Sequence, residues 1–493
     1  MDRSSGVLLH PSSFPGRYGI GEFSEHAYKF VDFLAATGQK RWQVLPLGPT
    51  GYGDSPYQCF SAYAGNPFLI SLDTLLHEDA LSPEDLADVP AFPVEHVDYG
   101  PVIEFKYRVL RKSHARFKQH ATSTQQSDFR VFCDRNAEWL DDYALFMALK
   151  DAHSGQVWNS WERDIARHEP WALAQWRATL AAEVETYQYL QYQFFRQWNA
   201  LKAYANQRGI RIVGDIPIFV ASDSADAWAH RELFYFDDSL NATFIAGVPP
   251  DYFSPTGQRW GNPLYRWDVM QQQGFAWWIE RCRAAFGMYD IVRIDHFRGF
   301  EAYWEVPATE PTAIHGRWVK APGHELFNAI EHALGKLPII AEDLGIITPE
   351  VEALRDAFGF PGMRVLQFAF VADTKSTYLP HNYISNCVAY SGTHDNNTTA
   401  GWFKSLEPAP RAQVLRYTGT DGSQIHWDMI RLLMMSVAGM TVVTMQDLLG
   451  LGEEARMNMP GQAGGNWGWR FTPEMLTPAI GARLKEMTDT YGR

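Results

Sequence analysis

The chain has 493 residues and a formal net charge of −14, with 46% hydrophobic and 20% charged residues, which is the composition of a globular protein. The acidic charge argues against a nucleic-acid partner, because binding to phosphates needs a basic face. No apolar run reaches the roughly 20 residues that cross a bilayer, so we expect no membrane partner. No signal-peptide pattern is present and the four cysteines are scattered, so we expect a cytoplasmic protein.

Strand candidates recur along the chain with helical segments between them. Most are continuous apolar runs, as expected for strands that are covered on both faces. In chain order they are residues 41–47, 68–73, 210–220, 290–297, 338–345, 363–370, 387–392 and 440–449. A helix over residues 26–38 precedes the first of them and ends at Gly38. Eight such strands separated by helices predict the α/β class, as a closed (β/α)₈ TIM barrel.

Two long segments do not fit a plain barrel of roughly 250 residues. In residues 77–208, apolar side chains such as Trp139, Tyr143 and Phe146 recur at helical spacing, which predicts a mostly helical insertion. Residues 246–267 are rich in turn residues, which predicts an active-site loop. With no repeat or flexible linker, we interpret residues 1–493 as a single catalytic barrel unit with inserted subdomains and no separate C-terminal β domain.

Three of the predicted strands stop abruptly at a carboxylate. They lie in the segments DIVRIDHF, PIIAEDLG and CVAYSGTHDN, and the acids are Asp295, Glu342 and Asp395. A barrel places its chemistry at the carboxyl ends of its strands. Three acids at one barrel mouth can supply a nucleophile, a proton donor and a group that holds the substrate. These are the groups that break a glycosidic bond.

The neighbours of the first two acids support separate roles. Arg293 and Asp295 point to the same side of a strand, and the guanidinium favours the ionised carboxylate that a nucleophile must be. Glu342 follows four apolar or small residues, so desolvation would raise its pKa and keep it protonated as a general acid. The alternatives are a structural ion pair for Asp295 and a helix-capping carboxylate for Glu342.

Around the third acid, polar side chains crowd together in SGTHDNNT. Such density after a buried run is hard to explain by packing, and Asp395 and His394 suit hydrogen bonds to sugar hydroxyls. Asp215, in VGDIPIF, adds a fourth strand-end acid. Four acids with His296 and His394 could instead hold a metal ion, which leaves a metal-dependent hydrolase as a rival class.

The segments, in their order, resemble a known family. They are PSSFPGRYGIGEF, LPLGPTGYGDSPYQ, FSAYAGNPFLISLD, VGDIPIFV, GVPPDYFSPTGQRWGNPLY, RIDHFRGF, AEDLG and SGTHDNNT, and they span nearly the whole chain. The chain is similar to the amylomaltases, the bacterial and plastid 4-α-glucanotransferases of the α-amylase clan. It looks like the shorter type in this family, without the additional N-terminal domain that some members carry.

The resemblance implies a retaining mechanism that uses neither a metal nor another cofactor. By position in the motifs, Asp295 would be the nucleophile, Glu342 the general acid/base and Asp395 the stabiliser of the transition state. It also implies a set of binding residues. Tyr57, Asp215, Arg293 and His394 would line the subsite of the transferred sugar, Asn466 would contact the neighbouring sugar, and a loop with Tyr252, Phe253, Gln258 and Trp260 would close over the substrate.

The residues alone indicate a retaining enzyme that acts on glycosides, and nothing more specific. Either water or a sugar hydroxyl could then attack the glycosyl-enzyme ester, which gives hydrolysis or transfer. Aromatic side chains in DYFSPTGQRWGNP could stack on acceptor rings, although they could also simply pin the loop to the barrel. With the resemblance, we predict transfer of α-1,4-glucan segments from maltooligosaccharides, starch or glycogen to the 4-hydroxyl of an acceptor glucan or glucose. An amylase-like hydrolase and a non-catalytic glucan-binding protein are further alternatives.

Overall fold

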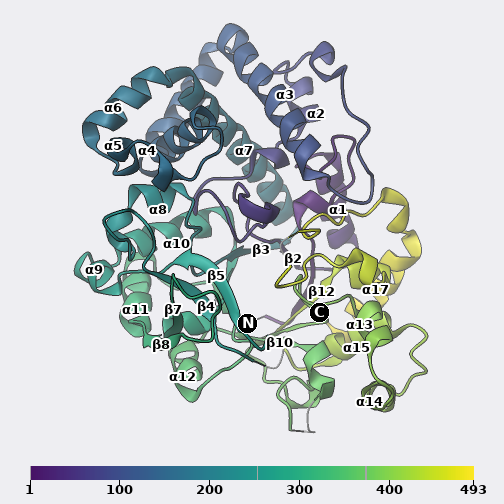
Figure 1. The fold of residues 1–493 in the computed structure, drawn as a ribbon. Coiled ribbons are helices and arrows are strands. Elements are labelled where there is room, and N and C mark those ends of the chain that lie inside the picture. The colour runs from purple at the N-terminus through teal and green to yellow at the C-terminus, as the bar shows by residue number, and fades with distance from the viewer. Residues whose placement is uncertain (1, 252–253, 372–374, 463) are drawn as a thin grey trace.

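A closed barrel of eight parallel strands forms the centre of the computed structural model, which describes residues 2–251, 254–371, 375–462 and 464–493 (Figure 1). The strand order around the barrel is β1-β12-β11-β10-β9-β6-β3-β2. The strands are β1 (Ser4–Leu8), β2 (Arg41–Gln43), β3 (Arg211–Ile216), β6 (Ile291–Ile294), β9 (Ile339–Ala341), β10 (Gly362–Val365), β11 (Cys387–Tyr390) and β12 (Met440–Thr444). The predicted (β/α)₈ barrel is confirmed.

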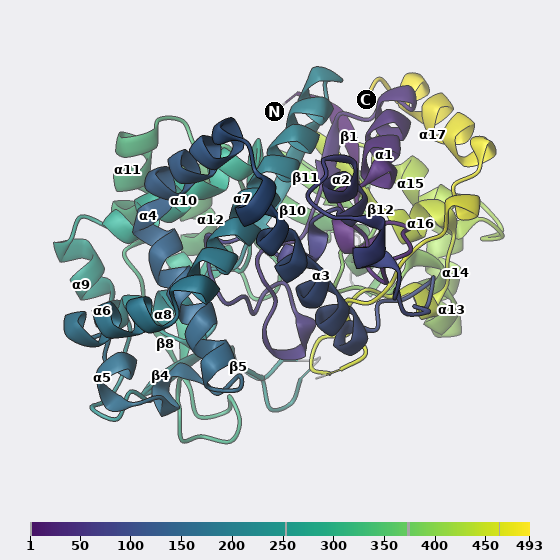
Figure 2. The ribbon, with the colours of Figure 1, turned by 90° about the horizontal axis from the view of Figure 1, so that it is seen from above.

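The helices cover the barrel and build a large addition to it. Those outside residues 77–208 are α1 (Glu25–Ala36), α2 (Leu72–His77), α8 (Ala225–Ala229), α9 (Trp267–Gln272), α10 (Ala276–Met288), α11 (Gly323–Leu334), α12 (Pro349–Ala357), α13 (Thr399–Ser405), α14 (Pro408–Thr418), α15 (Ile425–Met435), α16 (Met445–Leu449) and α17 (Pro478–Tyr491). The two chain ends meet, since α17 packs against α1 and Arg3 Nε donates to the carbonyl oxygen of Tyr491 at 3.1 Å (Figure 2). Among the described residues, no helix is both long and apolar enough to span a bilayer.

Residues 77–208 are mostly helical, as the spacing of their apolar residues predicts, with the α-helices lying in residues 99–207. The helices are α3 (Tyr99–His120), α4 (Ser123–Ala152), α5 (Arg163–Ala166), α6 (Pro170–Thr179) and α7 (Ala181–Gln207), and they gather in the upper part of Figure 1. Lys106 of α3 forms a buried ion pair with Glu22, which ties this addition to the loop before α1. Its description as an inserted subdomain of one catalytic unit stays a prediction.

One predicted strand is wrong, and an unpredicted one replaces it. Residues 68–73 form a 3₁₀ turn and the start of α2, because Asn66 and Ser71 accept hydrogen bonds from the backbone and cap these two helical segments. The missing barrel strand is β1. Its first residues are small and polar, but they are buried, and a Cβ on Gly6 would clash with the carbonyl oxygen of Arg41 on β2. The close approach of β2 thus explains the glycine in this strand.

The expected loop over residues 246–267 is mostly a β-hairpin. Its strands β4 (Phe244–Val248) and β5 (Gln258–Pro263) belong to an antiparallel sheet with β7 (Ala302–Pro307) and β8 (Arg317–Lys320), in the order β5-β4-β7-β8. Gly247 lies opposite both Arg259 and Trp304, so β4 is paired on both edges. The strand β7 lies more than 50 residues further along the chain than β4. The turn residues in this segment could not indicate that β4 pairs with it.

Candidate active site

A buried arginine joins two of the strand-end acids. Arg293 on β6 lies opposite Asp215 on β3, and its guanidinium donates to Asp215 Oδ2 at 2.5 Å and to Asp295 Oδ1 at 2.9 Å. Burial disfavours the charge of Arg293, but these two carboxylates outweigh it and raise the pKa of the guanidinium well above its ordinary value. The predicted pairing of Arg293 with Asp295 is confirmed, and the cation is permanently available to orient the Asp295 carboxylate.

Glu342 lies directly after β9 and is held by two backbone groups. The N–H of His296 donates to Oε2 at 2.7 Å, and the N–H of Leu344 donates to Oε1 at 2.8 Å. Burial, and then the negative charge of Asp295, raise the pKa of Glu342 to about 8, although Arg293 and the two N–H groups oppose the rise. The rise in pKa that the sequence predicts for Glu342 is present, and its role as the general acid stays a prediction.

Two cavities meet at the acids. The Tyr57 cavity is lined by Tyr57, His394, Asn458 and Trp467, among others, and the Glu342 cavity by Arg293, His296, Arg298, Trp318, Glu342 and Ile346, among others. Each has a volume of about 350 Å³, and both are lined by Gln258, Trp260, Asp295 and Asp395. Asp295 and Glu342 thus open into one cavity, and Asp295 also faces the other. The size of each cavity is typical of small-molecule sites.

Asp395 is held as an anion by its neighbours. His394 Nε2 lies 3.3 Å from Asp395 Oδ2, and Asn458 Nδ2 donates to Asp395 Oδ1 at 2.6 Å. Burial alone would raise the pKa of Asp395, but the charge and hydrogen bond of His394 and the Asn458 amide hold the pKa well below its usual range. The His394 ring stacks on Tyr57, with centroids 5.2 Å apart and planes at 16°. These groups form one wall of the Tyr57 cavity.

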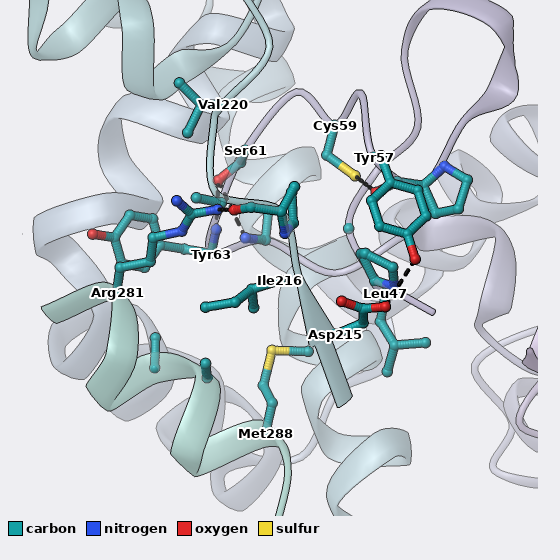
Figure 3. A pocket seen from close by; sticks show the side chains of 18 of the residues that line it. Leu47, Tyr57, Cys59, Ser61, Tyr63, Asp215, Ile216, Val220, Arg281 and Met288 are labelled. Atoms are coloured by element: carbon teal, nitrogen blue, oxygen red, sulfur yellow. Dashed lines mark hydrogen bonds between the residues drawn. The ribbon is translucent and has the colours of Figure 1, made fainter. Parts of the chain in front are cut away.

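Asp215 lies behind this wall and anchors it. Tyr57 donates its hydroxyl hydrogen to Asp215 Oδ2 at 2.8 Å, the same oxygen that accepts from Arg293. Figure 3 shows this oxygen turned toward Tyr57, beside a small cavity of about 50 Å³ that Cys59 and Arg281 also line. Asp215 is 1% exposed, and burial raises its pKa to about 6 against the charge of Arg293. This acid positions Tyr57 and Arg293 from inside the protein.

The hairpin β4–β5 covers the acids with an aromatic side chain. Trp260 Nε1 donates to Gln258 Oε1 at 3.1 Å, and the Trp260 ring meets the His296 ring edge to face, at 4.8 Å and 84°. Because Trp260 and Gln258 line both cavities, β5 spans the junction between them. The predicted binding residues Tyr252 and Phe253 lie outside the described residues.

Asn466 lies apart from the other predicted binding residues. Its side-chain Oδ1 accepts from the N–H of Met459 at 2.9 Å, and its Nδ2 donates to the carbonyl oxygen of Gln462 at 2.9 Å. The amide therefore holds the C-terminal segment in shape and is not part of the lining of the Tyr57 or Glu342 cavity. Its contact with a sugar stays a prediction.

The histidines near the acids do not form a metal-donor set. His296 lines the Glu342 cavity and His394 lines the Tyr57 cavity. Burial lowers the pKa of His296 to about 4, so its ring is neutral near pH 7. In the parts of the chain that the structure describes, no group of three or more His, Cys, Asp or Glu side chains is arranged to hold a metal ion. The described residues thus offer the metal-dependent alternative no ligand set.

Sequence reasoning missed Asn458, Trp467 and Trp318. Asn458 and Trp467 come from the segment after β12, where only the glycine-flanked tryptophan in GGNWGW gives a local signal. Trp318 lies on β8, and the guanidinium carbon of Arg298 lies 3.6 Å from its ring centroid. The position of Trp318 at the cavity wall, beside the buried Arg298, follows from the pairing of β8 with β7, which the sequence does not indicate.

Known proteins resemble this chain over its whole length. A profile of a family described as 4-alpha-glucanotransferase matches residues 9–477. A 4-alpha-glucanotransferase of Thermus thermophilus is 52% identical over 501 residues, covering 100% of this chain and 99% of the relative. One of Synechocystis sp. is 52% identical over 495 residues, covering 100% and 98%. The solved structure of an amylomaltase from Streptococcus agalactiae in complex with acarbose matches with a TM-score of 0.96 and 44% identity, covering 100% of both chains.

Proposed function

The chain belongs to the 4-alpha-glucanotransferase family and is a glucan transferase, and we propose that Asp295, Glu342 and Asp395 carry out the transfer by double displacement. The full-length match to transferases favours transfer over the hydrolase alternative. The observation that carries the assignment of residues is the shared cavity, which is lined both by an arginine-bound Asp295 and by a Glu342 whose pKa is raised.

In the first displacement, the donor sugar occupies the Tyr57 cavity and its glycosidic bond lies at the junction. Asp295 attacks the anomeric carbon, and Glu342 donates its proton to the glycosidic oxygen, so the leaving chain departs as an alcohol through the Glu342 cavity. A covalent glycosyl ester on Asp295 remains. Arg293 supports this step because it fixes the carboxylate that attacks.

The second displacement reverses these roles. Esterification removes the negative charge of Asp295, which is one cause of the raised pKa of Glu342. The pKa of Glu342 therefore falls, and the carboxylate accepts the proton of the incoming 4-hydroxyl group. The acceptor oxygen bonds to the anomeric carbon, and Asp295 leaves as a carboxylate. Two inversions at one carbon retain its configuration.

Asp395 stabilises the positive charge that develops on the sugar ring between these states. It is held as an anion by His394 and Asn458, and it lines both cavities, so it can accept hydrogen bonds from the hydroxyls of the reacting sugar. Such bonds strengthen as the ring approaches an oxocarbenium ion. Tyr57, stacked on His394, gives this sugar an apolar wall.

The Glu342 cavity provides the acceptor site, because the acid/base group must lie on the side of the leaving and entering oxygens. Trp260 and Trp318 contribute aromatic surface there, and the buried Arg298 holds the Trp318 ring in place. Stacking of an acceptor sugar on these rings would exclude water and orient the 4-hydroxyl. The donors and acceptors that fit are maltooligosaccharides, starch or glycogen chains and glucose. Independence of a cofactor and a cytoplasmic location stay predictions.

Incubation with maltotriose alone tests this proposal. A transferase yields glucose plus a ladder of maltooligosaccharides longer than the substrate, with no net gain of reducing ends. We expect this ladder from the wild-type chain and its loss in Asp295→Asn, whose side chain is similar in shape but cannot attack. Net formation of reducing ends without longer products would overturn the transfer mechanism, and a ladder of normal rate from Asp295→Asn would overturn the role of Asp295.

A further inference from the structure

Another cavity with aromatic walls lies between the helical addition and the barrel. It has a volume of about 470 Å³, which exceeds either active-site cavity, and it shares no lining residue with them. We call it the α4–α10 groove, since α4 and α10 supply most of its walls, and its lining includes Tyr63, Glu138, Trp139, Trp277, Glu280 and Arg283. Neither the fold nor the catalytic steps above use this groove.

Three aromatic rings form its apolar surface. The rings of Tyr63 and Trp139 are nearly parallel, with planes at 12° and centroids 6.3 Å apart, and the Trp277 ring stands at 89° to that of Tyr63. Tyr63 and Trp277 are buried, whereas Trp139 is half-buried and its Nε1 donates to Asn136 Oδ1 at 3.3 Å. The surface is therefore held rigidly before any ligand arrives, which reduces the entropy that binding costs.

Charged groups of both signs surround these rings. The lining contains three carboxylates, two guanidinium groups and an imidazole, from Glu138, Glu232, Glu280, Arg135, Arg283 and His230. Glu280 and Arg283 form an exposed ion pair at 3.1 Å. Because the charges nearly cancel, the groove attracts neither a phosphate nor a metal cation strongly, but it offers many hydrogen-bond donors and acceptors. A neutral ligand with many hydroxyl groups and an apolar face fits this combination.

We propose that the α4–α10 groove binds a segment of an α-glucan chain, separately from the catalytic cavities. The substrate class rests on the function proposed above. Like the Tyr57 and Glu342 cavities, the groove combines tryptophan rings with carboxylate and amide groups, and like the Glu342 cavity it also has guanidinium groups. Because a glucan is a polymer, one molecule can occupy the groove and the active site together, and the first contact then raises the effective concentration of the chain at the second.

Titration of the full chain with maltoheptaose tests the proposal, with Asp295→Asn present to prevent turnover. Ala276, at the exposed start of α10, lines the groove, so Ala276→Trp fills it without removing a contact. The matched control is Gln272→Trp, which adds the same side chain at the exposed end of α9, outside the lining. Glu280→Ala is a second variant, because loss of an exposed ion pair leaves the fold intact.

We expect two classes of maltoheptaose site in Asp295→Asn and in its Gln272→Trp derivative. In the Ala276→Trp derivative one class should disappear, and in the Glu280→Ala derivative the same class should weaken at least threefold. A single class in Asp295→Asn, or two unchanged classes in both groove variants, would overturn the proposal. The Ala276→Trp variant that keeps Asp295 should turn over maltotriose at the wild-type rate. Binding in the groove and the catalytic roles of the acids are therefore tested by separate measurements, so that one can fail without the other.

Discussion

The hydrogen bond from Asn458 to Asp395 gives a prediction that the sequence alone could not. Asn458→Ala removes a donor that lies 2.6 Å from Asp395 Oδ1. Hydrogen bonds to charged groups contribute roughly 1.5–3 kcal/mol, and the Asp395 side chain is 42% exposed, so solvent places the effect at the lower end. A loss of about 1.5 kcal/mol in the transition state corresponds to a roughly tenfold lower kcat.

The assay is glucose release from maltotriose across a pH series. Because the amide stabilises the charged carboxylate, its loss raises the pKa of Asp395, but His394 and Arg293 still hold that pKa low, so the loss in kcat should be similar at every pH of the series. Gln462→Ala is the control, since Gln462 is exposed in the same segment and supports Asn466 through its backbone carbonyl. A wild-type kcat in Asn458→Ala would refute the role given to this pair.

Three further outcomes are expected. Burial and Asp295 raise the pKa of Glu342 to about 8, and the first step needs the proton of this group. The value of kcat/KM should therefore fall as the pH rises through 8, and a pH profile that stays flat to pH 10 would contradict the acid role. The activity of Glu342→Gln should fall by several orders of magnitude with maltotriose, but by far less with a maltosyl fluoride donor, because fluoride leaves without a proton. Equal losses of activity with the two donors would count against the assignment of Glu342 as the acid. Trp260→Ala should lower the ratio of transfer to hydrolysis, measured as longer products against new reducing ends, and an unchanged ratio would remove Trp260 from acceptor binding.

The barrel and its acids were predictable because both depend on local patterns. A buried parallel strand is an apolar run, and a carboxylate at its end interrupts that run visibly, as at Asp295 and Glu342. The strand β1 was not predictable in this way. Its Gly6 is selected by the approach of Arg41 on the next strand, which no local pattern reveals.

The groups that complete the site escape prediction for a similar reason. Asn458 reaches Asp395 from 63 residues further along the chain, and Trp318 reaches the Glu342 cavity through the pairing of β8 with β7. The hairpin that carries Trp260 looked like a loop, because its strand β4 also pairs with the distant strand β7. Sequence patterns indicate the atoms that react, whereas the groups that orient them depend on contacts between distant segments.

The most direct test of the account is to identify the carboxylate that becomes glycosylated. A fluorinated maltosyl fluoride that forms the ester quickly and releases it slowly should add one maltosyl mass to the Glu342→Gln chain, and peptide mapping should place the added mass on Asp295. A label on Asp215, Asp395 or another side chain, or rapid turnover without any covalent adduct, would contradict the double displacement at Asp295.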